Sequence, residues 1–165
     1  MTAGGLTGGI FLPGCVQGPG RKHAVEGRAQ QIVGRIAYSL HDRVDMEPIH
    51  YVYDAPWIFG RTSAGSKLMT LAHNRWCAFE ADEAQGLFDW QSVVVKGPFM
   101  PFDPAVNPED HCRALAALRR LIPGTLTDDD PSPHRDVVFG VHASDILGRC
   151  SVSNGTQRWS EAASR

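Results

Sequence analysis

The hydrophobic and polar positions along the chain predict a fold made mainly of short strands. Large apolar side chains alternate with small or polar ones over residues 35–41, as on a half-buried strand. Further short runs are rich in β-branched and aromatic residues, and they predict strands at 49–53, 57–59, 76–80, 92–96 and 137–141. The hairpin-like spacing of these strands favours an antiparallel barrel over alternating strand and helix units.

One longer helix is predicted in the C-terminal half. Asn107 can cap it, Pro108 suits its first position, and two acidic residues follow where the helix dipole is positive. Leucines and Ile122 then repeat at helical spacing and predict an apolar stripe. A shorter helix is expected at residues 68–72, with Asn74 in a left-handed conformation at its end.

The same pattern predicts a single domain over residues 23–150. Residues 1–22 are rich in Gly and Pro and poor in apolar side chains, so we expect a flexible N-terminal tail. A short helical stretch is expected up to Val33, and an acidic loop at 82–86. The polar residues 151–165 are expected to form a flexible C-terminal tail.

Composition places the chain among folded cytoplasmic proteins. Apolar residues make up 42% of the chain and charged residues 21%, and the net charge of -2 gives no reason to expect nucleic acid as a partner. No apolar stretch has membrane length, and residues 1–5 lack the basic region of a signal peptide. The four cysteines are scattered, so we expect reduced thiols and no metal centre.

The chemistry of the chain is concentrated in residues 60–67. This segment has two cations, three hydroxyls and two glycines between a predicted strand and a predicted helix. Helix-start amides carry the positive end of the dipole, and hydroxyls with Lys67 can complete a shell around a phosphate. The alternative is an ordinary capped helix start with a solvated lysine, and residue types alone leave both interpretations open.

Other catalytic motifs are absent from the sequence. Gly60 and Gly65 have P-loop spacing, but Ser66 comes before Lys67 where that motif needs Lys followed by Ser or Thr. There is no HExxH, no GxSxG and no dinucleotide fingerprint after a strand. His50 lies within a predicted strand, where a histidine bonded to its neighbours is the commoner case.

The strand at 92–96 offers a possible wall for a planar ligand. By alternation Trp90, Ser92, Val94 and Lys96 share one face of the sheet. An aromatic and apolar surface with a few directed hydrogen bonds suits a planar cofactor, although tryptophan at a strand end also serves as a core or dimer contact.

Taken in order, these segments resemble the pyridoxamine-phosphate-oxidase-like superfamily, in particular its flavin-binding branch related to nitroimidazole-resistance proteins. The resemblance is carried by five phrases of the sequence, namely Gly34–Ala37, Pro48–Asp54, Arg61–Leu68, Cys77–Glu80 and Trp90–Gly97. It implies an antiparallel split β-barrel that forms a homodimer, with FMN in a cleft made by both subunits.

The resemblance also implies roles for single residues. Hydroxyls and one lysine would hold the FMN phosphate, namely Thr62, Ser63, Ser66 and Lys67. The strand around His50 would run beside the flavin, and Trp90 and Ser92 would come near it. Reduction of a flavin places negative charge on the pyrimidine side of the ring, and Arg61 is the candidate cation for that position.

The resulting hypothesis is an FMN-dependent oxidoreductase that transfers electrons or hydride to a small molecule. Three alternatives stay open at this point: a deazaflavin-dependent reductase, a non-catalytic protein that binds flavin or haem, and a barrel used only for interaction.

Overall fold

The structure is a computed structural model that describes residues 32–152 and 155–162. The tail predicted at 1–22 lies outside the described residues, and so does the helical stretch predicted up to Val33, apart from Ile32, which is not helical, and Val33, which begins a strand. Neither helix of the described part is long and apolar enough to cross a membrane.

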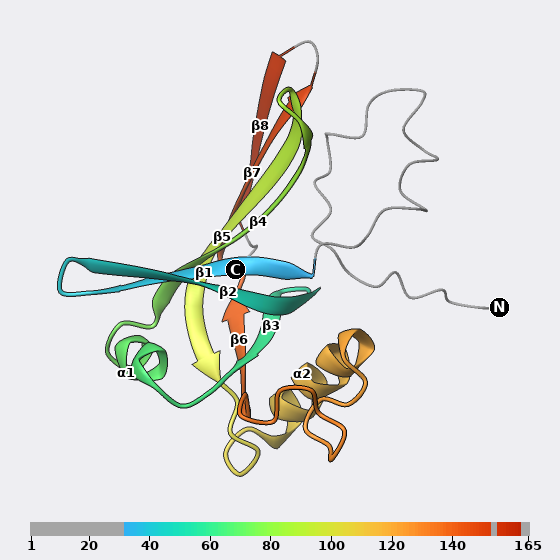
Figure 1. Ribbon diagram of the computed structural model, residues 1–165. Helices are drawn as coiled ribbons and strands as arrows, with labels where there is room; N and C mark the ends of the chain where they lie inside the picture. The colour runs from blue at the N-terminus through green and yellow to red at the C-terminus, as the bar shows by residue number, and fades with distance from the viewer. Residues whose placement is uncertain (1–31, 153–154, 163–165) are drawn as a thin grey trace.

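The described chain contains eight strands and two helices, shown in Figure 1. They are β1 (Val33–Leu40), β2 (Arg43–Asp54), β3 (Trp57–Thr62), α1 (Ser66–His73), β4 (Trp76–Gly86), β5 (Asp89–Pro101), α2 (Pro108–Leu121), β6 (Val137–His142), β7 (Asp145–Val152) and β8 (Gly155–Ala162). The sheet order is β4-β1-β2-β3-β6-β5-β7-β8, and β4 also pairs with β5, which closes a barrel. The prediction of an antiparallel split barrel with one longer helix in the C-terminal half is confirmed.

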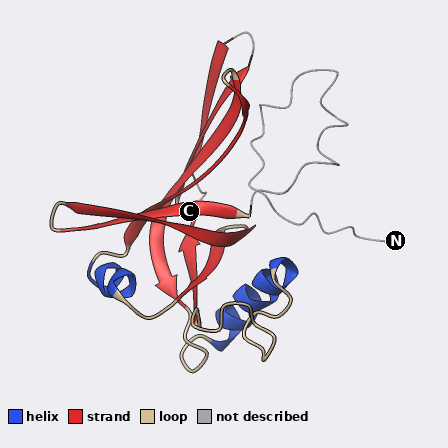
Figure 2. Cartoon of the chain, viewed as in Figure 1, coloured by secondary structure: helices blue, strands red, loops and turns tan. Residues whose placement is uncertain are grey.

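Two ribbons project from the barrel (Figure 1). The β1–β2 hairpin extends on one side, and the ends of β4 and β5 extend with β7 and β8 on another. Both helices lie on the side of the barrel away from this second ribbon (Figure 2). The first hairpin turns at His41 and Asp42, which both have positive φ.

The barrel interior is filled by the inward side chains of alternating strand positions. Along β5, Val93, Val95, Gly97 and Phe99 are buried, and the residues that alternate with them are half-buried. This confirms the face predicted for Trp90 to Lys96. Phe99 packs on Phe139 with ring centroids 4.7 Å apart. Removing each such side chain from water contributes about 1.5–3 kcal/mol, which is the main force that closes the barrel.

A second apolar cluster joins α2 to the outside of β3 and β6. Leu118 of the predicted stripe is buried and Leu121 packs against the same cluster, but the other buried residues of the helix are Ala114 and Ala117, which the prediction did not include. Small alanines let the helix approach Phe59 and Val138, which belong to the same cluster. Asn107 is the N-cap residue as predicted, but its side chain makes no capping hydrogen bond.

Three segments differ from the sequence prediction. Asn74 is extended rather than left-handed, because its side-chain amide donates to the carbonyl of Ser39 at 3.0 Å and ties α1 to β1. The residues predicted as an acidic loop at 82–86 continue β4, paired with β5. Finally, β7 runs to Val152 and β8 occupies part of the predicted C-terminal tail, held by main-chain pairing that apolar patterning does not reveal.

Two of the cysteines are free thiols, buried Cys77 and exposed Cys112. The expectation of reduced cysteines is therefore confirmed for these two. It is wrong for Cys150, which is disulfide-bonded.

The passage of β5 from its partner β7 to its partner β6 depends on Gly97. A Cβ atom at this position would lie 1.8 Å from the carbonyl oxygen of His142. A Cβ atom at Gly86 would meet nothing within 4 Å. We expect Gly97→Ala to lower the free energy of unfolding by about 1–3 kcal/mol, because backbone must move to make room. Gly86→Ala is the matched control, and equal denaturation midpoints for the two variants would contradict the close approach.

Candidate functional site

The segment between β3 and α1 presents open backbone amides and hydroxyls. Thr62, the last residue of β3, is buried, whereas Ser63 is half-buried and Ser66 is exposed. At the start of α1, the amide of Met69 donates to the carbonyl of Gly65 at 3.2 Å, which is the first hydrogen bond of the helix. Amides of the preceding turn therefore point out of the helix end, and no acidic side chain lies in that turn. This arrangement can accept an anion.

The side chain of Lys67 does not extend into solvent. Its ammonium pairs with the carboxylate of Glu47 at 2.6 Å and donates to the Thr62 hydroxyl at 3.2 Å. The Tyr38 hydroxyl also donates to Glu47. Burial opposes ionisation of Glu47, but these two hydrogen bonds together with the charges of Lys67 and Arg135 outweigh it and lower the pKa of the carboxyl. The alternative of a solvated lysine at a capped helix is therefore wrong.

Arg61 is buried against a carboxylate from a distant loop. Its guanidinium donates to both carboxylate oxygens of Asp130, one of them at 2.8 Å, and only 5% of Arg61 is exposed. The amides of Leu126 and Ser132 each donate to the same carboxylate at 2.8 Å. The hydrogen bonds from Arg61, against the cost of burial, hold the pKa of Asp130 well below its usual range. Because both terminal nitrogens of Arg61 bond to Asp130 and the residue is buried, little of its guanidinium is left to contact a flavin ring.

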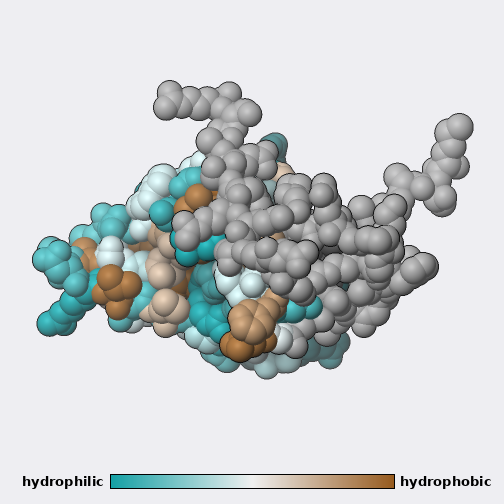
Figure 3. All heavy atoms as spheres, turned by 90° about the horizontal axis from the view of Figure 1, so that it is seen from above, coloured by the Kyte–Doolittle hydropathy of each residue, from teal (hydrophilic) through white to brown (hydrophobic). Residues whose placement is uncertain are grey.

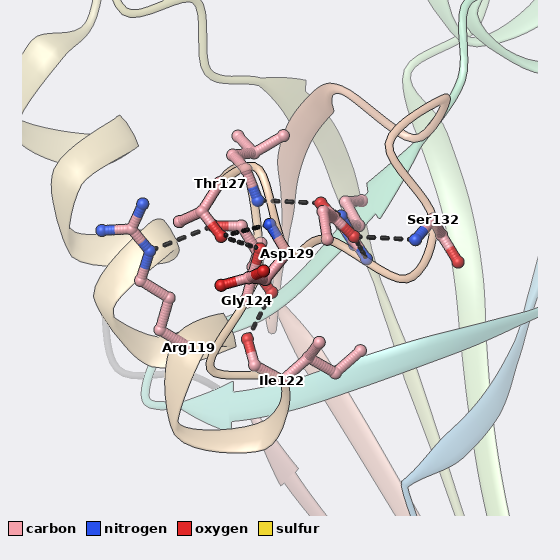
Figure 4. A network of polar contacts seen from close by, with 10 residues as sticks. Arg119, Ile122, Gly124, Thr127, Asp129 and Ser132 are labelled. Atoms are coloured by element: carbon pink, nitrogen blue, oxygen red, sulfur yellow. Dashed lines mark hydrogen bonds and ion pairs between the residues drawn. The ribbon is translucent and has the colours of Figure 1, made fainter.

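The loop that carries Asp130 is held by its own hydrogen bonds (Figure 4). Arg119 donates to the carbonyl of Thr125 at 3.1 Å, and the Thr125 hydroxyl donates to the carbonyl of Ile122 at 2.6 Å. The hydroxyl of Thr127 donates to the carbonyl of Gly124 at 2.8 Å. These bonds satisfy polar groups of the turn, so the carboxylate of Asp130 is presented in one position.

A further cation, Arg135, lies beside the same segment. Val137 pairs with Thr62, so the residues just before Val137 run next to Ser63. Arg135 is half-buried, and its guanidinium makes no hydrogen bond or ion pair with the described residues. Partial burial, then the charge of Arg135 and then that of Arg61, lower the pKa of His50. His50 is exposed on β2 and therefore lies within the field of both cations.

Trp90 and Ser92 lie elsewhere on the sheet. Both are half-buried on β5, and the Ser92 hydroxyl donates to Glu80 at 3.1 Å. Trp90 and Ser92 are separated from β2 by an ion-pair group. In this group the guanidinium of Arg35 on β1 pairs with the carboxylates of Glu80 at 3.1 Å and Asp82 at 2.7 Å on β4. Ser92 and His50 share the outer face of the sheet, but β1 and β4 lie between their strands. At the usual strand spacing, the distance between the two residues is about 14 Å.

The structure thus gathers one part of the predicted site and leaves another part apart. Thr62, Ser63, Ser66 and Lys67 surround the start of α1, and His50 lies near them on β2. We call the hydroxyls of Ser63 and Ser66 with the first-turn amides of α1 the cradle. The sequence did not single out Glu47, Asp130 or Arg135, because each meets the site through long-range pairing that no local motif records.

A family model described as pyridoxamine 5'-phosphate oxidase matches residues 28–149, which is most of the chain. The chain belongs to the pyridoxamine 5'-phosphate oxidase family. The resemblance seen in the sequence is thereby confirmed. Among curated proteins, none has significant sequence similarity to this member of the family.

Solved structures share the fold of this family member. An FAD-binding protein from Mesorhizobium loti superposes with a TM-score of 0.56 at 21% identity, over 70% of this chain and 83% of the other. An FAD-binding protein from Mycobacterium smegmatis gives 0.55 at 23% identity, over 73% and 86%. A heme-binding protein from Mycobacterium smegmatis gives 0.62 at 12% identity, over 80% of this chain and 53% of the other. At these identities the likeness concerns the fold.

The buried pair is expected to control stability. Arg61→Met should lower the denaturation midpoint strongly because it leaves the Asp130 carboxylate buried and unpaired, and Arg61→Met with Asp130→Leu should lose less than the sum of the single changes. Arg35→Met, which breaks exposed pairs, is the control and should change the midpoint little. Additive losses would contradict the direct pair.

The ion pair of Arg61 and Asp130 also makes the stability of the fold depend on pH in the acid range. Since the pKa of Asp130 is lowered in the folded state, the unfolded chain binds more protons as the pH falls. The contribution of the pair is complete above about pH 5 and is lost progressively below about pH 4. The difference in midpoint between the wild type and Asp130→Asn should therefore shrink over that range, and a constant difference would contradict it.

Proposed function

We propose that this protein binds FMN with its phosphate at the cradle and acts as an oxidoreductase that transfers electrons or hydride to a small molecule. The observation that carries the proposal is the open first turn of α1 between the hydroxyls of Ser63 and Ser66. A phosphate dianion needs several donors and a positive potential, and both are present there. Membership of an oxidase family and the FAD-binding relatives of the same fold support a flavin as the occupant.

The roles of single residues follow from the contacts. Thr62 and Lys67 form the floor of the cradle, where the hydroxyl of Thr62 accepts from the ammonium of Lys67. A phosphate above them would share this ammonium with Glu47. The lowered pKa of His50 favours its neutral form, which can offer a hydrogen bond to a ring without adding charge. The bound flavin would supply the redox chemistry, and the protein supplies binding, orientation and electrostatics.

The outer face of β1, β2 and β4 favours a homodimer. Several of its apolar side chains are widely exposed, including Val44, Met46 and Trp76, and Met46 is 62% exposed. In Figure 3 apolar patches accompany the hydrophilic tip of the projecting hairpin on the left. Because His50 lies on the same face, a second copy that covers these residues would also cover the approach to the cradle. We therefore place the flavin between two subunits.

Haem is the second candidate, since the heme-binding relative has a TM-score of 0.62. The two candidates differ in what they need from the site. Haem iron takes an axial ligand such as histidine, whereas FMN takes an anion site. His50 is an exposed histidine on the strand beside the cradle.

The absorption spectrum of the purified protein separates the candidates. Two flavin bands are expected, either on purification or after addition of FMN. A Soret band would point to haem, and a protein that ignores FMN would overturn the proposal. Reduction of the bound flavin by NADH or NADPH without oxygen would support catalysis, and failure to reduce it would favour a binding protein.

The cradle is tested by substitution. Ser66→Ala with Lys67→Ala should weaken FMN binding about 10- to 100-fold, because donors to a charged group are lost. Thr70→Ala, one turn further along α1, is the control and should leave the affinity unchanged. Since Lys67→Ala also frees Glu47, the denaturation midpoint of each variant must be recorded. Unchanged affinity in a folded double variant would contradict the phosphate site.

The homodimer is tested by mass in solution. Met46→Glu should shift the protein from dimer to monomer, because a charge is placed in an apolar contact. Val106→Glu is the matched control: Val106 is 72% exposed but lies in the loop before α2. A monomeric wild type, or equal behaviour of both variants, would contradict the proposed face.

A further inference from the structure

Of the three cations around the cradle, two are paired with carboxylates of the described chain and one is not. The guanidinium of Arg61 is bonded to Asp130, and the ammonium of Lys67 is paired with Glu47. Arg135 has no such carboxylate partner within the described residues. A half-buried guanidinium that forms no ion pair with the described residues keeps its charge free for an incoming anion. Among these three cations, Arg135 is the one whose charge is available to a ligand.

A chain of contacts fixes the position of Arg135. Arg61 holds the carboxylate of Asp130, and Asp130 accepts from the amide of Ser132 at 2.8 Å. The carbonyl of Ser132 accepts from the amide of Arg135 at 3.0 Å. On the other side, pairing of Val137 with Thr62 aligns the following strand with the end of β3. Arg135 is therefore set beside Ser63 from both directions.

The field of Arg135 reaches the residues around the cradle. Burial raises the pKa of Glu47, but the bonds from Lys67 and Tyr38 and the charge of Arg135 lower it further than burial raises it. Arg135 also contributes to the lowered pKa of His50. Its charge thus reaches two residues of β2, Glu47, which pairs with Lys67, and His50, which is consistent with the placement given by the strand register.

We propose that Arg135 is the cation that binds the flavin phosphate, and that Arg61 is a positioning residue that holds the loop carrying Arg135. This inference rests on the proposed function and names the main positive charge of the proposed phosphate site. A guanidinium can bind two phosphate oxygens at once, a geometry that the paired ammonium of Lys67 cannot supply. Arg61 contributes through Asp130 rather than by touching the cofactor.

The test compares FMN with riboflavin, which lacks the phosphate. Arg135→Gln should weaken FMN binding about 10- to 100-fold and leave riboflavin binding unchanged, as measured by quenching of flavin fluorescence. Arg135→Lys should keep part of the preference for FMN. Arg120→Gln removes an equal charge from an exposed position of α2 and should change neither affinity.

Each other outcome is decisive. Unchanged FMN binding by Arg135→Gln, equal loss for both ligands, or an equal loss in Arg120→Gln would overturn the role of Arg135. A wild type that binds neither FMN nor riboflavin would overturn the proposed function itself, and the inference with it.

The role of Arg61 has its own readout. Arg61→Met should lower the ratio of FMN to riboflavin affinity, and Arg61→Lys, which can keep one bond to Asp130, should restore part of it. A purely structural role would reduce both affinities together. An unchanged ratio in folded Arg61→Met would therefore overturn the positioning role.

Discussion

The buried ion pair between Arg61 and Asp130 joins two parts of the chain that are 69 residues apart. Removing two charges from water costs several kcal/mol each, and a single bond between them does not recover this. The pair is tolerated here because the carboxylate is fully used: two bonds come from Arg61 and two from the amides of Leu126 and Ser132. The loop before β6 therefore has one position relative to the end of β3, and everything that this loop carries is fixed with it.

The same principle accounts for Lys67. A lysine at the second position of α1 would ordinarily reach solvent, but here its side chain is buried and its ammonium contacts Glu47 and Thr62. Glu47 is set there by β2 and by its bond from Tyr38 on β1. Two strands and one helix are thus joined through one carboxylate. The backbone amides at the helix start are left without competition from an acidic side chain, as the proposed phosphate site requires.

How much the sequence predicted depends on the range of the interaction. The alternation in β5 and the apolar runs of β1, β3 and β6 identified strands and their faces, because burial acts on each strand separately. Register, closure and strand length depend on pairing, and the loop predicted at 82–86 became strand because β5 lies opposite it. Asn74 is not a left-handed cap because its side-chain amide donates to the carbonyl of Ser39, on another strand.

The site shows the same division. Residues 62–67 were identified because a local segment contains the hydroxyls and the helix start together. Asp130 appeared only as one of three consecutive aspartates, and nothing in the sequence distinguishes the one that meets Arg61. Arg61 looked like a ligand residue for the same reason: residue type and position were visible, and its partner was not. The positions of the charged residues could be predicted from the sequence, but not which opposite charge each of them pairs with.

The separation of His50 from Ser92 bears on how a cofactor could be shared. Across one chain they lie about 14 Å apart, with the bonded group of Arg35, Glu80 and Asp82 between them. In the proposed arrangement, a flavin anchored at the cradle would meet His50 of the same chain first. In the proposed homodimer, Trp90 and Ser92 would approach that flavin from the other subunit. If so, a substitution that separates the subunits should remove these side chains from the site as effectively as replacing them.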